Sequence, residues 1–418
     1  MPLEIRKQIY DNVHGYIGLT QAEVGVVDSP LFQRLRSILQ LECTYLVYPG
    51  ATHTRFEHSL GAMFMVDQFM SYIRKDGELL SENQEVAQKL RLAALLHDVG
   101  HYPLSHALEK VVVNSLGGRD HVEFGAQLIK GFFQDKLSSY RPSEIIDIIA
   151  GRDKAGLSMY ISSAFDADKS DYLLRDAYYT GVGYGRVGLQ RLIRTARYEK
   201  GRIIFGKDEA AVESFLLGRY HMFRSVYHHK TVIAFKVMME RIFEMLVEEG
   251  AVQHPDELLK SGDEMDLVAY DDHMLFSSMQ EYLRSGKTAF LKDLISMYIL
   301  RKPLAAVYIN PTPKEGADDT RMDLMIKEMC ASAKKRKEFA QRNNVNESDW
   351  IFPIYLRPLG LVDDETPVYV KDKESVRSLM NSHALILQMI GKKKLYDARI
   401  YTHPRYASRI LSAMNAQK

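Results

Sequence analysis

The stretch HDVGHYPLSH, which runs from His97 to His106, carries three histidines and an aspartate within ten residues. Neutral imidazole nitrogens and carboxylate oxygens together suit divalent metals such as Mn²⁺, Fe²⁺, Mg²⁺, Ni²⁺ and Zn²⁺. The only cysteines, Cys43 and Cys330, are too few for a thiolate zinc site or a disulfide framework. Any metal must therefore be held by histidine, aspartate or glutamate.

Two further segments, RFEHS and DADKSDYLLRD, offer candidate ligands on either side of this stretch. If they converge, two imidazoles and two carboxylates would bind a metal and leave positions for water, which the metal would acidify to hydroxide. The alternative is structural, with histidines that pack or cap helices and aspartates at the surface, and for the His-Asp dipeptide alone this alternative is favoured. The four candidate ligands are His58, His97, Asp98 and Asp168.

The elements that must position these residues are predicted to be helices over about residues 28–192. Apolar residues at helical spacing in FEHSLGAMFMVDQFMSYIRK place His58 in the first turn of a core helix. A second helix, EVAQKLRLAALLHDVG, is predicted to end at Gly100, with the His-Asp pair at its end. In a third, the spacing of Asp168 and Asp176 puts both on one helix face.

The later part of the chain changes in character. A strand pair is predicted around ARYEKGRIIFGKD, and one long helix from about Glu209 to Gly250. Strands are predicted at LAAVYINPT, WIFPIYLRP, TPVYVKD and LYDARIYT, and a loop at NPTPKEGADDTRMD. We predict a mainly α fold, with a helical catalytic core over residues 1–290 and a smaller α+β region over residues 291–418.

Composition excludes several classes of protein. A net charge of +1 and a hydrophobic fraction of 46% favour neither a disordered chain nor a globally basic nucleic-acid binder. No apolar run is long enough to cross a bilayer, and the first residues lack a signal-peptide hydrophobic segment. We therefore expect a cytoplasmic protein with no membrane partner.

The segments RFEHS, HDVGHYPLSH and DADKSDYLLRD occur in an order that resembles the HD-domain superfamily of metal-dependent phosphohydrolases. The resemblance is to its deoxynucleoside-triphosphate triphosphohydrolase branch, the dNTPases, and extends from about Lys7 to about Lys230. It implies an HD-domain helical core and one divalent metal ion per site on the four candidate ligands. It also implies hydrolysis of a dNTP at the α-phosphorus, by metal-activated water, to a deoxynucleoside and inorganic triphosphate.

The resemblance also implies roles for residues around the metal, because a triphosphate needs cations and its leaving oxygen needs an acid. Either His106 or His121 is implied to be the acid, and Glu109 its carboxylate partner, where the family has aspartate. The implied phosphate contacts are Arg55, Lys169 and Arg219. The implied sugar contacts, which would favour a deoxyribose, are Gln40, Tyr172, Asp176 and Tyr227.

Lys7, Asp28 and Arg36 match residues of an activator-nucleotide site in this branch, and the resemblance implies a homo-oligomer, either a dimer or a tetramer. For the activator-nucleotide site, a structural alternative remains. In it, Asp28 caps a helix that starts near Pro30 and Arg36 pairs on the face of that helix.

Two other functions remain open. The same centre would serve an HD phosphohydrolase acting on nucleoside monophosphates, cyclic nucleotides or another phosphate ester. A nucleic-acid-binding or regulatory protein with a vestigial site would use the basic runs SAKKRKEFAQR and GKKKLYD for backbone contacts. No aromatic stacking platform accompanies those runs, so the sequence does not support a nucleic-acid partner.

Overall fold

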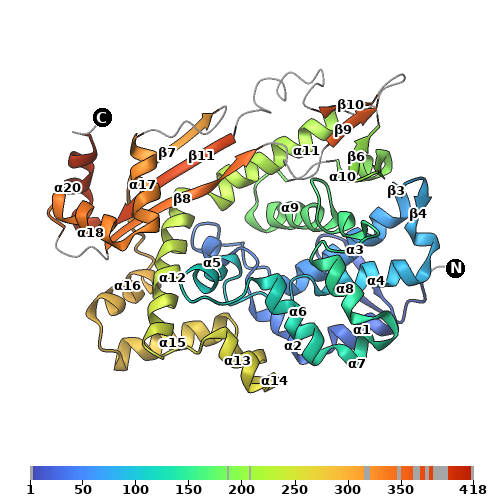
Figure 1. The fold of residues 1–418 in the computed structure, drawn as a ribbon, viewed down its shortest axis with the longest axis horizontal. Coiled ribbons are helices and arrows are strands. Elements are labelled where there is room, and N and C mark those ends of the chain that lie inside the picture. Colours follow the sequence, from blue (N-terminus) through green and yellow to red (C-terminus); the bar gives the residue numbers. More distant parts are fainter. Residues whose placement is uncertain are drawn as a thin grey trace.

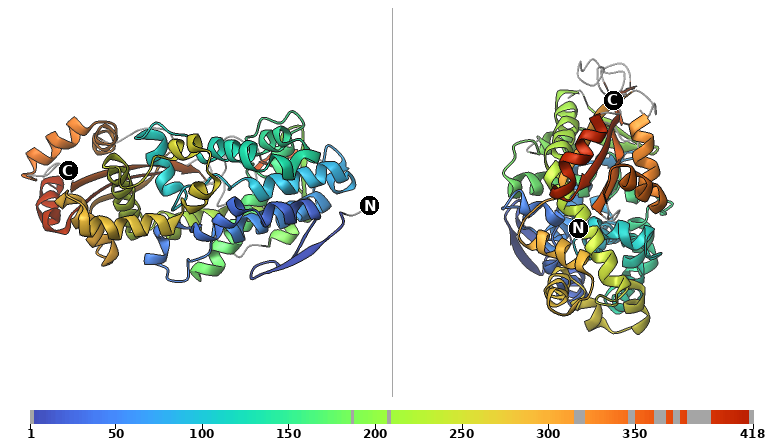
Figure 2. Two further views of the ribbon diagram at one scale, coloured as in Figure 1. Left: turned by 90° about the horizontal axis from the view of Figure 1, so that it is seen from below. Right: turned by 90° about the vertical axis from the view of Figure 1, so that its left-hand side faces the viewer.

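The computed structural model describes residues 3–185, 188–206, 209–314, 321–345, 350–360, 368–371, 376–379 and 394–415. Helices form most of this part of the chain, and its strands gather in small sheets, so the predicted mainly α fold is confirmed (Figure 1). The N-terminal and C-terminal ends lie at opposite ends of the molecule (Figure 2). None of the described helices is long and apolar enough to cross a membrane.

Three helices carry the predicted ligands: α3 (Arg55–Tyr72), α4 (Gln84–Leu96) and α9 (Ala167–Thr180). Helix α3 packs against both others. It begins with a capping box in which Thr54 and Glu57 satisfy each other's backbone N–H groups. Helix α9 begins where the Asp166 side chain accepts a hydrogen bond from the backbone of Lys169, and it ends at Gly181, whose φ of 76° suits glycine.

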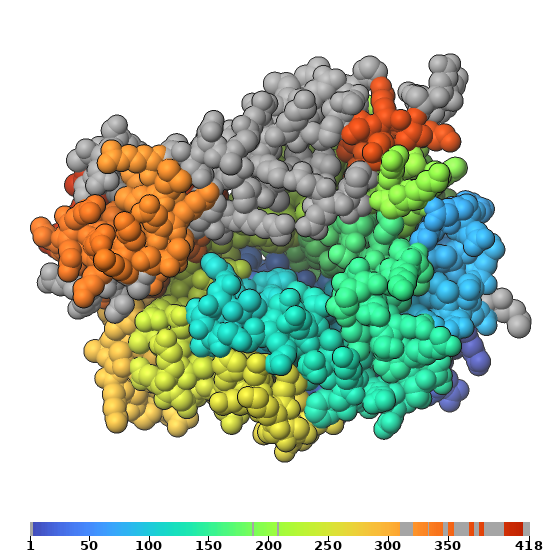
Figure 3. All heavy atoms as spheres, in the orientation of Figure 1, coloured from blue at the N-terminus to red at the C-terminus, as the bar shows by residue number. Residues whose placement is uncertain are grey.

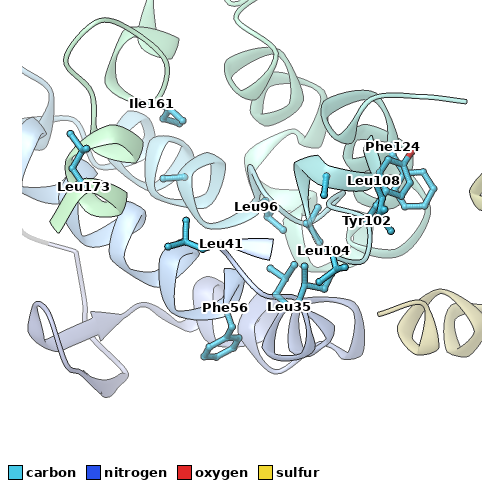
Figure 4. Packing of buried hydrophobic residues seen from close by; sticks show 14 of the residues in the cluster. Leu35, Leu41, Phe56, Leu96, Tyr102, Leu104, Leu108, Phe124, Ile161 and Leu173 are labelled. Carbon is cyan, nitrogen blue, oxygen red and sulfur yellow. The ribbon is translucent and has the colours of Figure 1, made fainter. Parts of the chain in front are cut away.

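Helix α4 does not continue to Gly100 as predicted, because it ends at Leu96 and the His-Asp pair follows in a turn. Gly100 has another role, since a Cβ there would lie 2.1 Å from the carbonyl oxygen of His121. The glycine thus lets the turn approach α6 (His121–Phe132) closely. Beyond the turn in sequence, buried side chains including Tyr102, Leu108 and Phe124 pack together (Figure 4).

The remaining elements before residue 206 are mostly short. The predicted strand pair is confirmed as β5 and β6, whereas the N-terminal hairpin of β1 and β2 was not predicted. In chain order the elements are β1 (Lys7–Asp11), β2 (Gly15–Leu19), α1 (Gln21–Val27), α2 (Pro30–Gln33), η1 (Arg34–Ser37), η2 (Glu42–Leu46), β3 (Arg74–Lys75), β4 (Glu78–Leu79), η3 (Leu80–Glu82), α5 (His106–Asn114), α7 (Gln134–Leu137), η4 (Ser138–Tyr140), α8 (Pro142–Ile149), η5 (Leu157–Tyr160), α10 (Leu189–Thr195), β5 (Ala196–Glu199) and β6 (Arg202–Phe205).

The single long helix predicted from Glu209 to Gly250 is wrong. The structure has α11 (Glu209–Met222), a π-helical turn η6 (Phe223–Tyr227) and a separate helix α12 (Lys230–Glu248). The backbone N–H of His228 donates to the carbonyl of Phe223 at 2.7 Å, which closes the wide turn. Apolar residues continue through the break, so their spacing does not reveal it.

The predicted C-terminal strands are present, and β7, β11 and β8 form an antiparallel sheet in that order. The loop predicted over residues 310–323 is wrong in part, because β7 continues to Lys314 and pairs with β11. The remaining elements are α13 (Pro255–Ser261), α14 (Glu264–Ala269), α15 (Asp272–Ser285), α16 (Ala289–Ile299), β7 (Ala305–Lys314), α17 (Arg321–Ala331), α18 (Ala333–Arg342), β8 (Ile351–Gly360), β9 (Val368–Lys371), β10 (Val376–Ser378), β11 (Lys394–Thr402) and α20 (Pro404–Asn415).

The C-terminal region has a small core of its own but is joined to the larger one. Its core gathers apolar side chains from Val307 to Ile410, whereas Leu291 and Leu294 of α16 belong to the main core. Strand β9 pairs in parallel with β6 and so extends a sheet that also contains β3 to β5. The division into residues 1–290 and 291–418 stays a prediction.

Candidate metal centre and catalytic pocket

The four predicted ligands converge. Nε2 of His58 lies 3.0 Å from Asp168 Oδ1 and 3.6 Å from Asp98 Oδ2, and Nε2 of His97 lies 3.2 Å from Asp98 Oδ1 and 3.8 Å from Asp168 Oδ1. Ligand atoms of His58, His97 and Asp168 all fall within 4.8 Å of one another. This cluster of imidazoles and carboxylates fits a divalent metal ion.

His58 shows why the cluster fits a cation. Its Nδ1 is 2.7 Å from a carboxylate oxygen of Asp171, which fixes the ring and leaves Nε2 to face Asp98 and Asp168. No described residue makes a hydrogen bond of good geometry to this buried Nε2, despite its closeness to Asp168. Burial alone would lower the pKa of His58, but the carboxylates of Asp168 and Asp171 raise it to about 10. Positive charge is thus favoured at this point, as a proton or as a metal ion.

Asp171 and the residues that hold it were not predicted from the sequence. Asp171 is fully buried, accepts hydrogen bonds from Nε and Nη2 of Arg175 at 2.9 Å, and lies 2.6 Å from Nε2 of His14. Arg175 also donates to Asp11 in β1. A Cβ at Gly61 would lie 1.9 Å from Asp171 Oδ1, so glycine is required where α9 meets α3. Asp168, Asp171 and Arg175 are spaced three and four residues apart along α9, and this spacing was the signal in the sequence that could have identified Asp171.

Asp98 is also held by a buried cation. Nη1 of Arg55 donates to Asp98 Oδ2 at 2.7 Å, and Nε of Arg55 donates to Ser105 Oγ at 2.9 Å. Burial opposes ionisation, but Arg55 and His97 hold the pKa of Asp98 well below its usual range. His101, which the sequence left without a chemical role, places Nε2 3.1 Å from Asp98 Oδ1.

A second group of histidines lies beside the metal cluster. The Glu109 carboxylate bridges them, with one oxygen 2.7 Å from Nδ1 of His106 and the other 2.7 Å from Nδ1 of His121. The ring of His101 stacks on that of His121 at 4.2 Å. Burial lowers the pKa of both imidazoles, but Glu109 outweighs it at His121, where the pKa is raised, whereas the pKa of His106 is lowered.

Three of the four predicted sugar contacts, Tyr172, Asp176 and Tyr227, lie in contact with one another. Asp176 is buried, with one carboxylate oxygen 2.8 Å from Nε2 of His53 and the other accepting from the Tyr227 hydroxyl at 2.5 Å. The rings of Tyr172 and Tyr227 meet edge to face at 6.4 Å. His53, which was given no role in binding from the sequence, thus contacts Asp176, a predicted sugar residue.

One pocket of about 740 Å³ joins most of these groups. Besides predicted residues it is lined by the Glu42–Lys236 ion pair, by Glu240 and by Ile354 of β8, which the sequence did not single out. A neighbouring groove of about 540 Å³ separates α5 and α12 from the C-terminal region, where the surface is hollowed (Figure 3). The predicted residues that line the pocket are Gln40, Arg55, His97, Asp98, His106, His121, Asp168, Tyr172, Asp176 and Tyr227.

Other predicted residues lie outside this lining. Lys169 forms an ion pair with Asp166 at 2.8 Å, and the guanidinium of Arg219 lies over the Phe223 ring. His58 lies behind the surface next to Asp98 and Asp168, and Glu109 lies behind His106 and His121, which it contacts through both carboxylate oxygens. The substrate roles of all these residues remain predictions.

The three predicted activator residues lie elsewhere. Nζ of Lys7 is 3.4 Å from an Asp28 carboxylate oxygen, and both side chains are about half exposed. Arg36 lies over the ring of Phe56. The capping alternative for Asp28 is wrong, because Ser29 occupies the N-cap position of α2 and Asp28 ends α1.

A helical core that brings a His-Asp pair, a further histidine and a further aspartate together, in a cluster that fits a metal ion, is typical of hydrolases of the HD type. Residues 55–176 match the HD domain family, and residues 187–416 match the HD associated region. The chain belongs to the HD-domain family of phosphohydrolases.

Similar proteins and structures span most of the chain. An uncharacterized protein of Methanocaldococcus jannaschii is 36% identical over 94% of this chain and 79% of its own length. The crystal structure of a phosphohydrolase of Bacteroides thetaiotaomicron superposes with a TM-score of 0.73 at 25% identity, covering 95% of this chain and 100% of that one. The deoxynucleoside triphosphate triphosphohydrolase SAMHD1 homolog of Dictyostelium discoideum is 28% identical over 62% of this chain, which spans only 54% of that protein.

Proposed function

We propose that this protein hydrolyses deoxynucleoside triphosphates at the α-phosphorus and releases a deoxynucleoside and inorganic triphosphate. The observation that carries the proposal is the single pocket in which His97, Asp98 and Asp168 lie together with His106, His121 and the set around Asp176. Relatives whose names include this activity support the choice of substrate. A divalent metal held by His58, His97, Asp98 and Asp168 would supply Lewis-acid activation of water.

The chain's own residues have separate tasks in this proposal. His121 is the acid that protonates the leaving 5′ oxygen, because its Nδ1 is held by Glu109 and its pKa is raised. His106, on the other oxygen of Glu109, contacts the phosphate in neutral form. Gln40, Tyr172, Asp176 and Tyr227 hold the sugar, and Arg55, Lys169 and Arg219 supply positive charge toward the phosphates.

The test is a metal screen with each of the four dNTPs and GTP, with products resolved by ion-exchange chromatography. Equal amounts of deoxynucleoside and intact triphosphate are expected, and His97→Ala is expected to abolish their release. His273→Ala, which removes an exposed histidine of α15, is the matched control and should keep full activity. Full metal-dependent turnover by His97→Ala would refute the mechanism.

If no metal leads to release of inorganic triphosphate, the result would favour the alternative function, hydrolysis of another phosphate ester. Nucleoside monophosphates, cyclic nucleotides and an aryl phosphate should therefore be assayed in parallel. Salt-sensitive binding of single-stranded nucleic acid without turnover would instead favour the binding alternative. Of its two basic runs, the first forms helix α18, whereas residues 391–393 of the second lie outside the described residues.

We also propose a homo-oligomer, a dimer or tetramer, with an activator nucleotide at Lys7, Asp28 and Arg36. The contact between Lys7 and Asp28 supports a shared site. Gel filtration with and without dGTP tests both ideas. An elution profile and a rate that do not respond to dGTP would remove the activator, and elution as a monomer would remove the oligomer.

A further inference from the structure

The π-helical turn η6 and the start of α12 form one wall of the catalytic pocket. Phe223, Tyr227 and His228 line the pocket there. The Tyr227 hydroxyl donates to Asp176, so the position of the turn determines where this pair of side chains meets the ligand. A π-helical turn is rare and is frequently found at functional sites, so contacts from outside that hold such a turn bear on the site.

The C-terminal sheet supplies such contacts from strand β11. Nη2 of Arg399 donates to the carbonyl oxygen of His228 at 2.7 Å, and the hydroxyl of Tyr401 donates to the carbonyl oxygen of Lys230 at 2.9 Å. Both side chains are buried, Arg399 at 4% exposure and Tyr401 at 0%. Hydrogen bonds made by buried donors are costly to lose, because the carbonyls left behind have no water to replace them.

These two donors are themselves held in place. Both carboxylate oxygens of Asp397 accept from the Arg399 guanidinium, and Nη1 of Arg399 donates to the Tyr401 oxygen at 3.1 Å. All three residues lie on β11, the central strand between β7 and β8. The neighbouring strand β8 contributes Ile354 to the pocket lining itself. The sheet is therefore a rigid support placed directly behind the wall of the pocket.

We infer that Arg399 and Tyr401 are positioning residues for substrate binding, and that the C-terminal sheet sets the wall of the catalytic pocket at Tyr227 and His228. The inference rests on the proposed function only for the identity of the substrate, because the two hydrogen bonds position the wall for any ligand of the pocket. It assigns the C-terminal region a part in substrate affinity, separate from the metal cluster.

The decisive variant is Tyr401→Phe, which removes one donor and keeps the ring. Tyr406→Phe, a hydroxyl removed from α20 in the same region, is the matched control. Arg399→Gln is a second test of the same wall. For Tyr401→Phe we expect the KM for the preferred dNTP to rise about fivefold to tenfold, the size of one buried hydrogen bond, with kcat changed less than twofold.

Amide hydrogen exchange provides a readout independent of turnover. In Tyr401→Phe, exchange should accelerate in peptides covering residues 223–231, while peptides covering α3 and α9 stay as in the parent protein. Unchanged exchange at residues 223–231 would overturn the inference, as would an unchanged KM or a fall in kcat without a rise in KM. If the parent protein releases no triphosphate, the proposed function fails alone, and KM is then measured with the phosphate ester that the parent does hydrolyse.

Discussion

Glu109→Gln tests the electrostatics of the histidine pair. The substitution keeps the size of the side chain and removes the charge that holds Nδ1 of both His106 and His121 at 2.7 Å. Without the carboxylate, the effect of burial, which lowers the pKa of an imidazole, is no longer outweighed at His121. The protonated form needed to donate to the leaving oxygen is then lost at a lower pH.

The size of the effect follows from the geometry. Glu109 and His121 are 15% and 21% exposed, so solvent screens their contact only in part. An opposite charge this close shifts a pKa by about 1–3 units, or about 1.4–4 kcal/mol. The alkaline limb of the pH profile of kcat should therefore move to lower pH by at least about one unit, and turnover above that limb should fall at least about tenfold.

The assay is kcat against pH between pH 5 and 9, with metal at saturation. Glu123→Gln is the control, because it removes an exposed carboxylate from the first turn of the same helix, α6. Metal content measured on both variants shows whether the metal cluster has survived. An alkaline limb at the same pH in Glu109→Gln and the parent protein would refute the assignment of His121 as the acid.

Three further variants test how the site is held. Asp171→Asn should weaken metal binding about tenfold to a hundredfold, because Nδ1 of His58 loses its anionic partner. Metal titration measures the affinity, and an affinity equal to that of the parent protein would contradict this role of Asp171. Gly61→Ala should lower the free energy of unfolding by at least about 1–3 kcal/mol in urea, since a methyl group cannot fit beside Asp171; parental stability would contradict that packing. Burial raises the pKa of Asp272 to about 7, so its ionisation destabilises the fold as pH rises from about 4 to 7. Asp272→Asn should therefore gain stability relative to the parent protein over that range, and an identical pH slope would contradict this.

The part of the site that could be predicted consists of residues in local motifs. His97 and Asp98 adjoin each other, and His58 lies in the first turn of α3 as the apolar spacing indicated. Glu109 was implied by the resemblance, and it follows His106 by three residues on α5, which puts the two side chains on one helix face. In each case the chemistry and the helix period lie within a few residues, which a sequence displays directly.

What could not be predicted depends on contacts between distant segments. Asp171 looks like a surface acid on α9 until Arg175 and His14 are seen to contact it, and Arg175 is itself held by Asp11, which lies 164 residues away. The break at η6 is invisible because the apolar period continues through it. The hydrogen bond from Arg399 to His228 spans 171 residues, and no local pattern encodes such a pairing.

The parallel pairing of β9 with β6 has a consequence for biosynthesis. Ile203, Ile204 and Phe205 of β6 meet Val368 to Val370, so this edge of the sheet stays open until synthesis has reached the last eighth of the chain. An open edge of apolar residues is a template for pairing with other chains. Expression of a shortened chain that ends before β9 should thus yield aggregation-prone material, even though the ligands of the metal cluster are all present in it.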